Sequence, residues 1–98
     1  MSKHFNQLTP AEHERLSLLI EEMGESLQAA GKILRHGYES SWDGGPTNRV
    51  TLCHELGDVR HCLQRLIDAG DLDEVVIERG RADKAARVGR FLHHQDRP

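Results

Sequence analysis

TPAEHERLSLLIEEMGESLQAAGKILRHG, residues 9–37, is the most strongly patterned stretch of the chain. It opens with a capping box, Thr9 to Glu12, with proline at the first helical position. Gly37 follows a basic pair and is typical of a left-handed C-terminal cap. The stretch therefore predicts a helix over 10–36, with one apolar stripe at helical spacing. The stripe consists of Leu16, Leu19, Ile20, Met23, Leu27, Ala30 and Leu34.

A second helix is predicted over 48–69, after a loop of about ten residues. Thr47 or Asn48 can cap it, and Gly70 ends it. Loops of this length are uncommon in small domains and are often functional. The second helix carries its own apolar stripe, which consists of Leu52, Leu56, Val59, Leu63 and Leu66.

A third helical region is predicted over 72–93. Asp71 or Asp73 can begin it, and we expect Gly80 and Gly89 to break it into two pieces. The three elements predict a single all-α domain over 1–98, a small helical bundle. So short a chain buries only about two-thirds of its surface. We therefore expect oligomerisation through the two long helices, as a homodimer or homotetramer, to complete the core.

Composition and charge narrow the class of protein. The chain has 98 residues and a net charge of −3. Residues 1–78 carry 7 basic and 14 acidic side chains, and residues 79–98 carry 6 basic and 2 acidic ones. A nucleic-acid binder is usually basic throughout, so we expect no nucleic-acid partner. No apolar run approaches the roughly 20 residues that span a bilayer, and no segment resembles a signal peptide. We expect no membrane association and a cytoplasmic protein.

Two four-residue motifs carry the chemistry of the chain. Glu22-Met-Gly-Glu25 and Glu55-Leu-Gly-Asp58 share one order: acid, apolar residue, glycine, acid. Residues three apart lie on one face of a helix, and the second pair borders its apolar stripe. Each glycine costs its helix about 1 kcal/mol relative to alanine, which favours close helix approach at this level. Carboxylates crowded in this way repel one another unless a cation neutralises them. The four acids therefore predict a site for Mg²⁺, or Mn²⁺ as a substitute; the alternative is an ordinary solvated acidic face.

Glu21-Glu22-x-x-Glu25 followed by Glu55-x-x-Asp58 resembles the signature of the all-alpha nucleoside triphosphate pyrophosphohydrolases, which include the MazG-like proteins. The resemblance covers roughly residues 9–70. Residues 31–40 and 90–95 make short bacteriophage-type members the most similar, which would place the protein in a bacterial host cytoplasm. The 29 residues between the acid pairs make a rather long connection, which leaves the loop's role and the base preference open.

The resemblance implies hydrolysis of a (deoxy)nucleoside triphosphate, with a lean to a purine such as dGTP, to the monophosphate and pyrophosphate. It assigns the metal to Glu22, Glu25, Glu55 and Asp58, and orientation or deprotonation of the attacking water to Glu21. Glu21 and each basic candidate below have a plainer alternative as a solvated surface residue, and Asn48 has one as a helix cap. The candidates for phosphate are Lys32, Arg35, Lys84 and Arg87, and those for the base are Trp42, Tyr38 and Asn48.

Two other functions remain open at this point. A ferritin-like di-metal bundle uses Glu-x-x-His pairs, and the chain has none, so redox iron is disfavoured. A non-enzymatic helical adaptor would use the acids as a solvated face and the C-terminal helix to bind its partner. Such an adaptor would be indifferent to Mg²⁺ and to acid-to-amide substitutions at the four positions.

Overall fold

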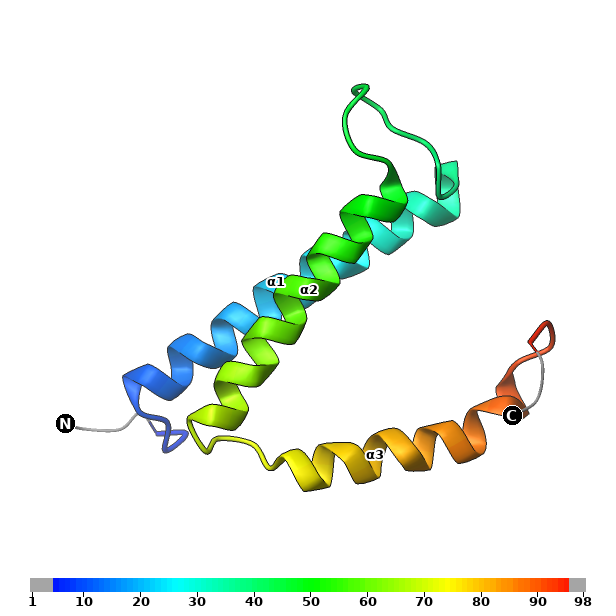
Figure 1. Cartoon of the computed structure of the whole chain (residues 1–98). Coiled ribbons are helices and arrows are strands. Elements are labelled where there is room, and N and C mark those ends of the chain that lie inside the picture. Colours follow the sequence, from blue (N-terminus) through cyan, green and yellow to red (C-terminus); the bar gives the residue numbers. More distant parts are fainter. Residues whose placement is uncertain (1–4, 96–98) are drawn as a thin grey trace.

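The computed structural model describes residues 5–95, and within them all regular structure is helical. Helix α1 spans Pro10–His36, α2 spans Asn48–Asp68 and α3 spans Glu74–Arg87. A short 3₁₀ helix, η1, follows over Val88–Phe91. Figure 1 shows α1 and α2 crossing as a long pair, joined by the loop at one end, while α3 leads away from the other end.

The capping box of α1 is confirmed. The Thr9 hydroxyl accepts a hydrogen bond from the Glu12 backbone N–H (3.1 Å), and the Glu12 carboxylate accepts one from the Thr9 N–H (2.8 Å). Gly37 ends the helix, but in a different conformation from the predicted left-handed cap. Its φ of 88° and ψ of 166° lie in a region open almost only to glycine. Its N–H still donates to the Ile33 carbonyl at 2.7 Å.

Side-chain caps also set the starts of α2 and α3. Thr47 is the cap of α2, because its hydroxyl accepts from the Val50 N–H. Asp73 caps α3 in the same way. The predicted break at Gly80 was wrong: α3 runs through it unbroken and changes to 3₁₀ geometry only at Val88. A single glycine destabilises a helix by only about 1 kcal/mol relative to alanine, so an isolated glycine need not end it.

The contact between α1 and α2 is narrower than the apolar stripes predict. Small or slender residues lie buried at it: Ser26, Ala29 and Cys62, together with Leu66, which is fully buried. The α1 stripe only partly faces α2, because Ile20, Met23, Leu27 and Leu34 remain 49–90% exposed. Ser26 and Ala29 let the two backbones approach closely, so α1 turns that face, with Glu22, toward α2. The exposed part of the stripe is left as an apolar face of α1.

The two glycines of the acidic motifs do not make this contact. Gly24 and Gly57 are exposed, and a Cβ atom added to either would meet nothing within 4 Å. The expectation that they mark close helix approach was therefore wrong for the single chain. Ser26 and Ala29 fill that role on α1 instead.

The described chain is open rather than closed around a core. Its radius of gyration is 17.2 Å, against about 13 Å for a compact domain of this length. A cleft of about 600 Å³ separates α2 from α3, and Leu63, Ile67, Val75 and Ile77 are among the residues that line it. None of the helices within residues 5–95 has the length and apolarity needed to cross a membrane.

An ion pair ties the end of α2 to the first turns of α1. Arg15 donates two hydrogen bonds to the Asp71 carboxylate, at 2.6 and 3.0 Å. These bonds favour the ionised carboxylate and hold the pKa of Asp71 below its ordinary value. The pair fixes where the chain leaves α2, and hence where α3 starts.

Candidate metal centre

Three glutamates from the two long helices meet at one point. Glu22 and Glu25 come from α1 and Glu55 from α2, and one carboxylate oxygen of each lies within 4.8 Å of the others. We call these three residues the carboxylate cluster. Asp58, the fourth predicted ligand, is exposed and lies outside the cluster, although its charge still acts on Glu22 and Glu55.

Two oxygens of the cluster lie buried without a partner. Glu22 Oε2 and Glu55 Oε2 are both inaccessible and accept no hydrogen bond from any residue within 5–95. Buried polar atoms in folded proteins nearly always have a partner. An unpartnered buried oxygen therefore needs a specific explanation. The simplest explanation here is a proton or a cation bound between the carboxylates.

Crowding shifts the titration of these acids. Burial raises the pKa of Glu22, and the neighbouring charges of Glu25 and Asp58 raise it further. The pKa of Glu55 is also raised, first by a hydrogen bond shared with Glu25 and then by burial. Each shift means that negative charge is disfavoured there without a compensating cation.

A hollow of about 430 Å³ opens beside the cluster. Glu25 and Glu55 line one part of it, and three of the predicted substrate contacts, Lys32, Trp42 and Asn48, line it as well. A second hollow shares Lys32, Trp42 and Asn48 and adds Arg35. The structure therefore brings four of the seven predicted phosphate and base contacts together, close to the cluster.

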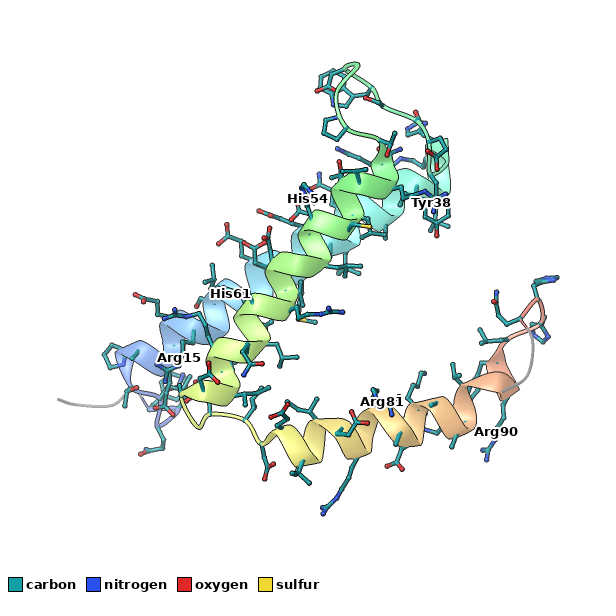
Figure 2. The ribbon with its side chains drawn as sticks, in the orientation of Figure 1. Arg15, Tyr38, His54, His61, Arg81 and Arg90 are labelled. Carbon is teal, nitrogen blue, oxygen red and sulfur yellow. The ribbon has the colours of Figure 1, made fainter. Side chains whose placement is uncertain are left out.

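The other three predicted contacts lie elsewhere. Tyr38 is engaged with Arg49, whose guanidinium lies 4.3 Å from the ring centroid. Lys84 and Arg87 are on α3, which leads away from the α1–α2 pair. Figure 2 shows the same separation through Arg81 and Arg90, far from His54 and His61 on α2.

Glu21, the predicted catalytic residue, is exposed on α1 next to Glu22. It lies outside the carboxylate cluster, and its charge contributes to the raised pKa of Glu22. Its position leaves it open to solvent at the margin of the site.

The hollow also contains residues that the sequence analysis missed: Gln28, Asp43, Pro46 and Thr51. Helical spacing could have found two of them. Gln28 lies three residues beyond Glu25, and Thr51 lies four before Glu55, so each shares a face with a cluster residue. Asp43 and Pro46 belong to the loop, and no periodic signal places them.

Comparisons with known proteins add no identification. No protein-family model, curated protein or solved structure gives a significant match to this chain.

Proposed function

We propose that the protein is a Mg²⁺-dependent pyrophosphohydrolase acting on a nucleoside triphosphate. One observation supports this above the others: three carboxylates from two helices converge, and two of their oxygens are buried with no partner in the described part of the chain. Oxygen ligands of this kind suit a hard divalent cation, Mg²⁺ or Mn²⁺. Glu22, Glu25 and Glu55 would hold the metal, and Asp58 would join them through a small movement or a bridging water.

The reaction is an in-line displacement at the α-phosphorus. The oxygen of a water molecule forms a bond to that phosphorus while the bond to the α–β bridging oxygen breaks. The products are a nucleoside monophosphate, pyrophosphate and one proton. A divalent cation, when bound, supplies charge neutralisation for the triphosphate and lowers the pKa of water. Glu21 is proposed to orient the water or accept its proton at the open margin of the site.

The hollow beside the cluster has the chemistry of a nucleotide site. Lys32 and Arg35 carry the positive charge that phosphate oxygens require. Trp42 offers a ring for base stacking. Asn48 offers its amide oxygen for a base edge, since its Nδ2 donates to the Gly37 carbonyl at 3.1 Å. The tyrosine proposed for stacking, Tyr38, would first have to leave Arg49. A purine triphosphate such as dGTP is the proposed substrate.

We further propose that a second copy of the chain completes the molecule, as a homodimer or homotetramer. The apolar face of α1 and the cleft beside α3 leave much apolar surface uncovered in one chain. Residues 79–98 carry 6 basic and 2 acidic side chains, so this segment has the charge to pair with the carboxylate cluster of another copy. Lys84 and Arg87 would then reach phosphate in the site of a partner, because their own helix leads away from its own site.

A helical adaptor is the second candidate, and the exposed apolar face of α1 favours it. A ferritin-like di-metal bundle has less support, because histidine is missing from the carboxylate cluster. Two measurements distinguish the pyrophosphohydrolase from the adaptor and the di-metal bundle: Mn²⁺ binding measured by electron paramagnetic resonance, and an activity assay. The proposal predicts Mn²⁺ binding that Glu55→Gln weakens, and turnover that excess chelator abolishes. Undiminished turnover in chelator would exclude the metal mechanism.

A further inference from the structure

The loop side of the hollow carries an acid that the proposed reaction does not use. Glu25 and Glu55 border the hollow from the helices, and Trp42 and Asp43 border it from the loop. Lys32 lies two helical turns beyond Glu25, about 10 Å along α1. The hollow therefore extends from the proposed metal ligands past a cation to an aromatic ring and a carboxylate. Its 430 Å³ falls within the range of small-molecule sites.

The Asp43 carboxylate is held in one orientation. Its Oδ1 accepts a hydrogen bond from the Gly45 backbone N–H at 2.9 Å. The single proton of the Ser41 hydroxyl is donated to the Gly45 carbonyl at 3.0 Å, which closes the turn, and the same hydroxyl lies 3.4 Å from Asp43 Oδ1. No residue within 5–95 donates to Asp43 Oδ2. An ionised carboxylate only accepts hydrogen bonds, so an exposed acceptor borders the hollow together with Trp42.

We propose that Asp43 is the base-reading residue and that the site takes a guanine nucleotide. The inference rests on the proposed function for the position of the phosphates. Guanine is the common base with two adjacent N–H donors, N1–H and the N2 amino group, on its pairing edge. Asp43 can receive both, one at Oδ2 and one at the lone pair of Oδ1 that Gly45 N–H does not use. Adenine and cytosine would turn a ring acceptor toward the carboxylate, and uracil and thymine flank one N–H with two carbonyl oxygens. The Asp43 carboxylate, which can only accept hydrogen bonds, disfavours the edges of these other bases, because a base nitrogen or oxygen with a lone pair would then face a carboxylate oxygen.

Trp42 makes the proposal measurable without turnover. It is the only tryptophan of the chain and it borders the hollow, so its fluorescence reports occupation directly. The probes are the α,β-methylene analogues of GTP, ATP, CTP and UTP with Mg²⁺, since their α–β bridge resists hydrolysis. Calorimetry on the same samples measures binding independently of the tryptophan signal.

The expected result is at least about tenfold tighter binding of the guanine analogue by the full-length protein. Asp43→Asn should remove most of that preference, because the amide can turn a donor toward any base. Asp68→Asn is the matched control: it removes the same charge near the other end of α2, and the preference should persist. Equal binding of the four analogues, no binding by either method, or a guanine preference unchanged in Asp43→Asn would overturn the proposal.

The two proposals fail separately. If the protein hydrolyses all triphosphates with no base preference, the assignment of Asp43 is wrong and the proposed reaction stands. If the guanine analogue binds through Asp43 but no triphosphate releases pyrophosphate, the base site stands and the proposed reaction is wrong.

Discussion

Glu22 and Glu55 occupy positions where a helical pair normally places apolar side chains. Each has one oxygen that is shut off from solvent and has no hydrogen-bond partner among residues 5–95. Burying a charge without a partner is strongly unfavourable, so these positions weaken the metal-free fold. Residues that cost stability without improving packing are typical of functional sites, and this cost is the reason we connect the cluster with a cation.

Removing one ligand tests the role of the cluster. Glu55→Gln keeps the size of the side chain but loses its charge, so Mg²⁺-dependent turnover should fall. Loss of a residue that only supports a metal ligand already costs roughly 10–100-fold, and loss of a direct ligand should exceed about 100-fold. Glu14→Gln, on an exposed part of α1, is the control and should retain activity. Steady-state kinetics with circular dichroism as a check on folding measures both; an active Glu55→Gln would remove Glu55 from the site.

Metal-free protein should become more stable as the pH falls from about 7 toward 4.5, the ordinary value for glutamate. The folded state holds the pKa of Glu22 and Glu55 above that value. Over this interval the folded protein binds protons that the unfolded chain does not, and uptake favours the folded state. Asp71, whose pKa Arg15 lowers, works in the opposite direction, but only below its ordinary value of 3.8.

Thermal unfolding in chelator across this pH range measures the effect. Glu22→Gln should flatten the rise, and Mg²⁺ at about pH 7 should raise the melting temperature of the wild type more than at pH 5. A melting temperature that falls steadily from pH 7 downward would contradict the raised pKa values.

At the scale of the helices, the small residues Ser26 and Ala29 lie at the contact between α1 and α2, and the glycines of the acidic motifs do not. Ser26 and Ala29 permit close approach of α2, whereas Gly24 and Gly57 face open space. The acidic motifs thus carry a glycine that the contact between α1 and α2 does not require. Unless a second copy packs there, these glycines only weaken their helices.

Gly57→Ala should therefore stabilise the protein by about 1 kcal/mol, because alanine favours the helix and its Cβ meets no atom. Denaturant unfolding, followed by circular dichroism, measures the change. Leu66→Ala, at the fully buried position, should lower stability by roughly 2–5 kcal/mol and shows that the assay responds. A destabilised Gly57→Ala protein would instead indicate that another surface packs against that glycine.

The helices were predictable from the sequence because capping residues and 3.6-residue periodicity are local signals. Thr9, Glu12 and Gly70 mark ends that the structure confirms within a residue or two. The rotation of α1 was not predictable, because Leu27 and Leu34 fit the stripe as well as Leu16 does. Only contact with α2 shows that Ser26 and Ala29 form the inner face.

The candidate site was predictable to a similar extent. Two motifs identified Glu22, Glu25 and Glu55, since spacing along a helix fixes which acids share a face. The exclusion of Asp58 from the cluster depends on the relative rotation of α1 and α2, which is a tertiary property. The position of Asp43 beside the cluster was not predictable, because a loop has no regular period from which the neighbours of a side chain can be inferred.

At the scale of the whole molecule, the described part of the chain leaves apolar residues of α1 exposed and an apolar-lined cleft open between α2 and α3. The radius of gyration of 17.2 Å exceeds the value of about 13 Å for a compact domain of this length, and in our proposal a second copy covers these apolar surfaces. A twofold dimer would place the same surfaces against each other twice.

Mixing two inactive variants tests this arrangement. Glu55→Gln lacks a metal ligand, and Arg87→Ala lacks a cation on α3, so each alone should lose activity. If α3 serves the partner's site, a hybrid dimer contains one site with both residues intact. Unfolding the variants together and refolding them should then restore about a quarter of the wild-type rate. A mixture no more active than its components would show that Arg87 does not act across the dimer.

The central claim is that the carboxylate cluster catalyses metal-dependent release of pyrophosphate from a nucleoside triphosphate. The most direct measurement incubates the protein with each of the eight common ribo- and deoxyribonucleoside triphosphates and Mg²⁺ or Mn²⁺, and then separates the products. We expect monophosphate and pyrophosphate in equal amounts, formed fastest from a guanine nucleotide, and neither product in excess chelator. Release of orthophosphate, or no product from a folded protein shown to bind Mn²⁺, would contradict the central claim.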